Sequence, residues 1–270
     1  MKRNCTYKNI IMNIILNIMS NQVIRKTDKV LVLDLDETLV HTYTDVDIGG
    51  IIDRKNPELM SRYFEFTLQN GNSPMKICGV ERPGLQEFLI FANKYFDSVI
   101  VWTAGIAEYA KMIVDHIYRD IPQKPKLIWS RGHCEGSGTE TKPYTKPLTK
   151  LENSRPDIVG QDILRRAIII DDRDYTGRDH NPQNQMLIPP FDPMPLDSTY
   201  GSTDDALYKV KNWLFWPEIK HAYDIKKSNK SRPFQVPLPI SGMSRLSRPT
   251  LIPTAQQLQV LQGDEFYRRT

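Results

Sequence analysis

The chain has 270 residues, of which 40% are hydrophobic and 25% are charged, and its formal net charge is +4. This length and composition allow a full buried core, so they exclude a peptide hormone or a fibre and favour one large domain with extensions. Its three cysteines are widely spaced and form no CxxC pair, which argues against a zinc site and indicates reduced thiols in an intracellular protein, nuclear or cytoplasmic.

Residues 1–28 are expected to form an N-terminal extension. Its apolar run, NIIMNIILNIMS at 9–20, follows Lys2, Arg3 and Lys8 as the apolar region of a signal peptide would. Three asparagines interrupt the run, no cleavage site of the Ala-x-Ala type follows, and the run is too short to span a bilayer. We therefore expect an amphipathic helix or a loose leader, and no membrane span.

Strand and helix patterns alternate between residues 29 and 223, which we expect to form a single α/β domain. Strands that alternate with helices predict a Rossmann-like parallel sheet with helices on both faces. Strands are predicted at 30–35, 98–102 and 167–170, and helices at 85–95, 106–118 and 203–216.

Short insertions interrupt this alternation. Residues 63–68 and 75–80 flank a loop that contains Asn70 and Gly71, which is a common signal for the turn of a β-hairpin. The segment at 126–146 is also short, and we expect no large cap domain. The cleft at the end of the sheet is therefore expected to be open.

Residues 224–270 are expected to form a poorly ordered basic tail rich in proline and serine. Eight basic residues oppose two acidic residues after Ile225. Such a tail is typical of a solvated extension, although it also offers a surface for nucleic acid or an acidic partner.

Polar side chains gather where the predicted strands end. In open parallel sheets the carboxyl ends of the strands share one edge, and ligands bind there. A cluster of carboxylates at that edge stays ionised only if a cation neutralises it, and hard oxygen ligands with room for a phosphate suit Mg²⁺. The residues at this edge are Asp34, Asp36 and Thr38 after the first strand, Thr103 after the second, and Asp171 and Asp172 at the end of the third.

Five motifs follow one another along the domain: DLDETLV at 34–40, VERPGLQEFL at 80–89, VWTAG at 101–105, KPLTKL at 146–151 and IIIDDRD at 168–174. In order and spacing they resemble the RNA polymerase II carboxyl-terminal-domain phosphatase-like family, also called NLI-interacting-factor-like, of the haloacid-dehalogenase superfamily. The resemblance covers most of the chain. It implies a haloacid-dehalogenase-like fold and a Mg²⁺-dependent phosphatase of phosphoserine and phosphothreonine in proteins, acting on Ser-Pro repeats such as the polymerase tail.

The resemblance also implies roles for individual residues. Asp34 would be the nucleophile that forms an aspartyl-phosphate, and Asp36 would be the general acid and base. Thr103 and Lys146 would bind the phosphoryl group, and Thr38 would hold the loop and contact phosphate.

For the metal, the resemblance implies the carboxylate of Asp34, the backbone carbonyl of Asp36 and the carboxylate of Asp171. Asp172 would orient metal-bound water or Lys146.

Several assignments stay open at this stage. Lys142 and Lys150 lie close to Lys146 in sequence and are alternatives to it. Arg131, in SRGHC at 130–134, fits either a phosphate-binding residue or a surface ion pair.

Two other functions remain to be distinguished from a protein phosphatase. A polynucleotide phosphatase would share the DLDET motif and use the basic tail, but the slightly acidic catalytic part argues against nucleic acid. A non-catalytic binding module of the same fold would typically lack the motif aspartates, whereas Asp34, Asp36 and Asp171 are all present.

Overall fold

The structure of the protein is a computed structural model that describes residues 26–44, 55–70, 73–193 and 204–235. The N-terminal apolar run, the hairpin residue Gly71, Thr203 at the predicted start of the last helix, and the tail beyond Gln235 lie outside these residues. Within the described parts of the chain, none of the helices has the length and apolar character needed to cross a membrane.

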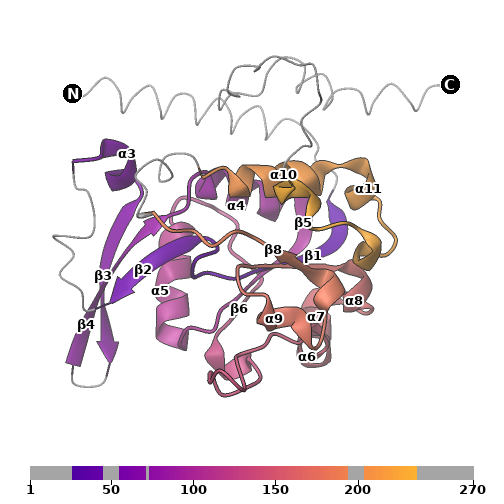
Figure 1. Ribbon diagram of the computed structural model, residues 1–270, viewed down its shortest axis with the longest axis horizontal. Helices are drawn as coiled ribbons and strands as arrows, with labels where there is room; N and C mark the ends of the chain where they lie inside the picture. The colour runs from indigo at the N-terminus through magenta and orange to yellow at the C-terminus, as the bar shows by residue number, and fades with distance from the viewer. Residues whose placement is uncertain (1–25, 45–54, 71–72, 194–203, 236–270) are drawn as a thin grey trace, which may run out of the picture. The chain divides into compact units, whose positions relative to one another are not determined.

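The core of the domain is a parallel sheet of five strands in the order β6-β5-β1-β7-β8 (Figure 1). Its central strand pairs on both sides, with Leu31 opposite Val99 of one neighbour and Ile168 of the other. This confirms the predicted α/β class. The strands are β1 Thr27–Leu33, β5 Phe96–Trp102, β6 Leu127–Trp129, β7 Ala167–Asp171 and β8 Gln185–Leu187.

Helices cover both faces of this sheet, because each strand alternates its side chains between two apolar layers. Leu31 and Leu33 of β1 face one layer, and Val30 and Val32 face the other. The first layer includes α4 Leu85–Tyr95, α5 Ala107–Ile117 and α10 Ala206–Phe215, and the second includes α6 Leu148–Ser154, α7 Pro156–Val159 and α8 Ile163–Arg166 (Figure 1).

The predicted hairpin is present as the antiparallel strands β3 Tyr63–Asn70 and β4 Ser73–Glu81. A third strand that was not predicted, β2 Val40–Thr44, pairs with β4 directly after the DLDETLV turn. Gly79 of β4 lets both neighbouring strands approach closely, because a Cβ atom there would lie 2.5 Å from the Phe64 ring of β3 and 2.6 Å from the carbonyl oxygen of His41 on β2.

Short helices complete the domain: α3 Pro57–Met60, α9 Tyr175–Arg178 and α11 Pro217–Lys220. The chain then continues through two 3₁₀ turns, Ile225–Lys227 and Arg232–Phe234. Ile225 is fully buried, and the Lys230 ammonium donates to the carbonyls of Ile225 (2.6 Å) and Ser228 (3.2 Å).

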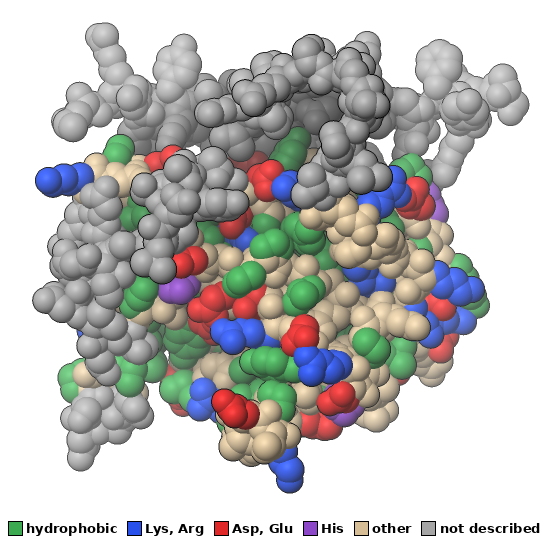
Figure 2. Space-filling view, in the orientation of Figure 1, with side chains coloured by type: hydrophobic (Ala, Val, Ile, Leu, Met, Phe, Trp, Pro, Cys, Tyr) green, Lys and Arg blue, Asp and Glu red, His purple; other side chains and the backbone are tan. Residues whose placement is uncertain are grey.

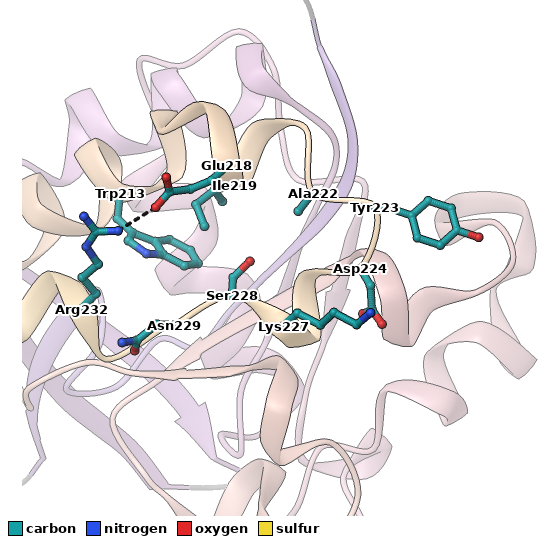
Figure 3. A pocket seen from close by; sticks show the side chains of 10 residues that line it. All are labelled: Trp213, Glu218, Ile219, Ala222, Tyr223, Asp224, Lys227, Ser228, Asn229 and Arg232. Atoms are coloured by element: carbon teal, nitrogen blue, oxygen red, sulfur yellow. Dashed lines mark hydrogen bonds and ion pairs between the residues drawn. The ribbon is translucent and has the colours of Figure 1, made fainter.

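The first residues of the segment expected to be a poorly ordered tail are therefore structured and pack on the domain, because an apolar side chain and a buried ammonium fasten them. A cavity of about 410 Å³ lies between α10, α11 and this segment (Figure 3). None of its lining residues belongs to the motifs at the strand ends.

Candidate active site

The DLDETLV motif forms a tight turn directly after β1. The amide of Asp34 still donates to the carbonyl of Ile170 on β7 (3.0 Å), which fixes Asp34 at the strand end. Glu37 has a left-handed backbone conformation (φ 54°), and the amide of Leu39 donates to the carbonyl of Leu35 (2.8 Å). The turn thus holds its side chains at the carboxyl edge of the sheet, where ligands of such folds bind.

Arg82, from the VERPGLQEFL motif, stabilises this turn by hydrogen bonds to its backbone. Its side chain is fully buried and donates to the carbonyl of Thr38 (3.0 Å) and, at a longer distance, to that of Glu37 (3.4 Å). It also donates to the carbonyl of Pro189 (2.7 Å) and forms an ion pair with Asp204. Sequence reasoning placed Arg82 in a motif without a role, since its partners are distant in the sequence.

The centre of the site is one ammonium between two carboxylates. Lys146 Nζ lies 2.5 Å from Asp34 Oδ1 and 2.7 Å from Asp171 Oδ2, and all three residues are buried. The two alternatives to this lysine lie elsewhere: Lys142 is exposed and Lys150 is half-buried. Lys146 reaches the site because its amide is fixed to the carbonyl of Thr176 (2.8 Å).

Burial dominates the electrostatics of this centre. It raises the pKa of Asp34 well above the usual range, with Asp171 and Asp36 acting in the same sense and Lys146 opposing them. Burial alone lowers the pKa of Lys146, but the charges of Asp171 and Asp34 outweigh it and hold that pKa above its usual value. Lys146 therefore stays an ammonium, and negative charge remains in excess at the strand ends.

A third carboxylate borders the same space. Asp34, Asp171 and Asp172 each offer an oxygen within 4.8 Å of the others. Burial and the charge of Asp171 raise the pKa of Asp172 to about 6, and its Oδ1 is buried without a hydrogen-bond partner among the described residues. An unsatisfied carboxylate oxygen in an all-oxygen donor set fits a hard cation such as Mg²⁺. The other oxygen of Asp172 pairs with Arg173 (2.9 Å), not with Lys146.

The side chain of Asp36 belongs to a separate hydroxyl network. Its Oδ1 accepts a short hydrogen bond from the Tyr109 hydroxyl and a longer one from Thr42 (3.4 Å). Its Oδ2 accepts from the Thr103 hydroxyl (3.3 Å). Sequence reasoning missed Tyr109 as a site residue because it falls on the apolar stripe of α5, where an aromatic residue is usually core. Thr42 carried no signal.

The two threonines expected to bind phosphate differ in their surroundings. The Thr103 hydroxyl accepts from the amide of Gly105 (2.9 Å) and donates to Asp36, so its orientation is set. The Thr38 hydroxyl is buried and has no hydrogen-bond partner among the described residues. A buried hydroxyl without a partner is costly, and a bound phosphate oxygen would satisfy it.

Arg131 lies beside the site rather than in its centre. Its exposed side chain donates to the carbonyl of Ala104 (2.8 Å) and stacks over the ring of Tyr144, 5.5 Å from the centroid. Neither of these contacts is an ion pair. Arg131 is thus fixed next to the loop that carries Thr103, with its guanidinium open to solvent.

The sequence is similar to those of known phosphatases. A family model described as NLI interacting factor-like phosphatase matches residues 29–225. Phosphatase PSR1 of Saccharomyces cerevisiae is 27% identical over 203 residues, which cover 75% of this chain and 39% of that protein. A probable C-terminal domain small phosphatase of Dictyostelium discoideum is 28% identical over 177 residues, covering 66% of this chain and 46% of that protein. The chain spans less than half the length of these two relatives.

Two solved structures align with part of this chain. The fission yeast RNA polymerase II CTD phosphatase Fcp1 aligns with a TM-score of 0.47 and 24% identity, covering 61% of this chain and 42% of that chain. A second Fcp1 structure aligns with a TM-score of 0.48 and 18% identity, covering 76% of this chain and 59% of that chain. Since the family model spans most of the chain, the protein belongs to the NLI interacting factor-like phosphatase family.

Proposed function

We propose that this chain is a Mg²⁺-dependent phosphatase of phosphoserine and phosphothreonine in proteins, and that it acts through an aspartyl-phosphate on Asp34. One observation supports this above all. Asp34 lies buried at the carboxyl edge of the sheet, 2.5 Å from the Lys146 ammonium, with two further carboxylates beside it. This arrangement provides a nucleophile, a phosphate-binding cation and oxygen ligands for a metal in one place.

The metal would be held by the carboxylates of Asp34 and Asp171 and the backbone carbonyl of Asp36, with Asp172 beside them. Bound Mg²⁺ would offset the excess negative charge so that a phosphate dianion can approach Asp34. Lys146 would move from its ion pairs to a phosphoryl oxygen. The hydroxyls of Thr103 and Thr38 would complete the phosphate site, with Arg131 at its edge.

The reaction would proceed in two displacements. An oxygen of Asp34 forms a bond to phosphorus while the bond to the serine or threonine oxygen breaks, and Asp36 donates a proton to that leaving oxygen. A water oxygen then attacks phosphorus and gives its proton to Asp36, while the bond between phosphorus and Asp34 breaks. Asp36 is thereby returned to its protonated form.

A protein substrate is supported by the shape of the domain and by its surface. The insertions near the site, the β2-β4-β3 sheet and the segment before Lys146, are short. On the face seen in Figure 2, acidic and basic side chains of the described residues are interspersed, without the long basic stripe typical of nucleic-acid binding. One relative is named a probable C-terminal domain small phosphatase, and a Ser-Pro segment such as the RNA polymerase II tail is the substrate class that we propose.

The test is release of phosphate from a Ser-Pro phosphopeptide, with and without Mg²⁺, by wild type and by Asp34→Asn. We expect Mg²⁺-dependent release that falls to background in Asp34→Asn. Asp97→Asn, a change of the same kind at an exposed position on β5, is the matched control and keeps full activity. Normal release by folded Asp34→Asn contradicts the nucleophile, and no release by metal-loaded wild type contradicts the proposed function.

A further inference from the structure

The two oxygens of the Asp36 carboxylate have different surroundings. Oδ1 faces two hydroxyls, those of Tyr109 and Thr42, which also lie 3.1 Å from each other. Among the described residues, the one hydroxyl that donates to Oδ2 is that of Thr103, at 3.3 Å, and Thr103 is expected to bind phosphate. The carboxylate is thus held through Oδ1, whereas Oδ2 lies beside the threonine that is expected to bind phosphate.

Tyr109 is itself held rigidly. Tyr109 is only 8% exposed and lies on the buried face of α5. A Cβ atom at Gly105 would lie 2.6 Å from Cδ1 of the Tyr109 ring, so the glycine of the VWTAG motif is needed to let the ring lie where it does. A tyrosine fixed by packing can fix its hydrogen-bond partner in turn, because little side-chain entropy is lost when the bond forms.

We propose that Tyr109 is a positioning residue for Asp36: its hydroxyl anchors Oδ1 so that Oδ2 exchanges the proton with the leaving oxygen and with water. This inference rests on the proposed function. Tyr109 keeps its own proton throughout and forms no bond to substrate. In the first displacement the proton passes from Oδ2 to the serine oxygen as the bond between that oxygen and phosphorus breaks. In the second displacement a water proton returns to Oδ2.

A positioning role predicts a dependence on the leaving group. A general acid matters most when the leaving oxygen is strongly basic, as in phosphoserine, and least for an activated aryl phosphate. Tyr109→Phe keeps the ring and removes only the hydroxyl. We expect kcat/KM on a phosphoserine peptide to fall by about 10- to 100-fold, a part of the ~10²- to 10⁴-fold that a general acid provides.

The experiment measures kcat/KM for a series of aryl phosphates with leaving groups of increasing pKa, together with the phosphopeptide. Loss of positioning makes the slope of log kcat/KM against leaving-group pKa steeper in Tyr109→Phe, with the smallest loss on p-nitrophenyl phosphate. Tyr95→Phe is the matched control, since it removes another buried tyrosine hydroxyl, which donates to the carbonyl of Leu214 (3.1 Å) in the core. Its slope remains that of wild type.

Thr42→Val is a second variant, which removes the other hydroxyl that donates to Asp36 Oδ1. Its slope is also expected to be steeper than that of wild type, but the change is smaller than in Tyr109→Phe because the hydrogen bond from Thr42 to Asp36 is longer. Unchanged slopes in both variants overturn the inference. If wild type is active, Asp34→Asn is inactive and the slopes do not change, the proposed function stands without this role for Tyr109. If wild type shows no Asp34-dependent release at all, both fail together.

Discussion

The ion pair between Arg82 and Asp204 connects the DLDETLV turn to the start of α10. Removing it tests whether this pair stabilises the turn. The Arg82 side chain is 0% exposed and that of Asp204 is 17% exposed. Arg82 Nε lies 3.0 Å from Asp204 Oδ1, and its terminal nitrogen lies 2.9 Å from Oδ2, which is the bidentate geometry of a strong pair. Asp204→Ala leaves the guanidinium buried without its counter-ion.

The expected magnitude follows from this burial. Breaking a buried ion pair by removing one partner destabilises a protein by ~3–5 kcal/mol, because the remaining charge is left desolvated. Arg82 keeps the carbonyls of Thr38 and Pro189, and water reaches the Asp204 side, so the lower end of about 3 kcal/mol is expected. Asp204→Asn retains a hydrogen-bond acceptor for Arg82, so it is expected to destabilise the protein less than Asp204→Ala does.

Urea denaturation followed by far-UV circular dichroism measures this loss. With a slope of about 2–3 kcal/mol/M, Asp204→Ala lowers the midpoint by roughly 1 M. The control is Glu218→Ala, which removes the ion pair between Glu218 and Arg232 (Figure 3). The side chain of Glu218 is 60% exposed and that of Arg232 is 53% exposed. An exposed pair contributes less than about 1 kcal/mol, so the midpoint of this variant moves by at most ~0.5 M. A shift in Asp204→Ala no larger than in this control refutes the reasoning.

Two further predictions concern pH and the end of the domain. The pKa of Asp172 is raised to about 6, so without metal the folded chain binds more protons than the unfolded chain between about pH 4 and 6, and stability falls as pH rises through that range. In EDTA, the free energy of unfolding of wild type is therefore expected to fall by about 1–2 kcal/mol more than that of Asp172→Asn between about pH 4 and 7. Urea titrations that show equal decreases for the two proteins contradict this. A chain ending after Asp224 lacks the buried Ile225 and Lys230 and is expected to be about 2–3 kcal/mol less stable than one ending after Gln235. Equal melting temperatures of the two chains show that this segment does not stabilise the domain.

The parts of the fold that were predictable are those whose signal is local. Strands β1, β5 and β7 each contain a continuous apolar run, which is the pattern of strands buried on both faces. Strands β6 and β8 have only three residues each, too few for any period to emerge. β2 escaped notice because its pairing with β4 depends on a turn that only the folded chain forms.

The site divides in the same way. The aspartates and threonines at the strand ends are visible in the sequence because the topology of parallel sheets gathers them at one edge. Tyr109 and Arg82 were not recognisable as site residues, since one lies on an apolar helix stripe and the other is paired with a residue 122 positions away. Their contribution depends on packing at a distance, which a linear pattern does not contain.

In the proposed mechanism, the groups that would make bonds to phosphorus and the groups that would move protons lie in two different parts of the site. Asp34 lies with Lys146 and Asp171, whereas Asp36, only two residues later, lies with Tyr109 and Thr103. Substitutions in the first part are expected to slow every substrate alike, because phosphorus would be attacked there whatever the leaving group is.

Substitutions in the second part are expected to affect substrates according to the basicity of the leaving group, because only protons would move there. Both aspartates belong to the turn whose carbonyls Arg82 holds. Loosening that turn through Asp204→Ala is therefore expected to disturb both parts together, lowering kcat/KM across the aryl series with little change in slope. Arg82 would therefore support both parts of the site, since a displaced turn would move the proposed nucleophile and the proposed acid together.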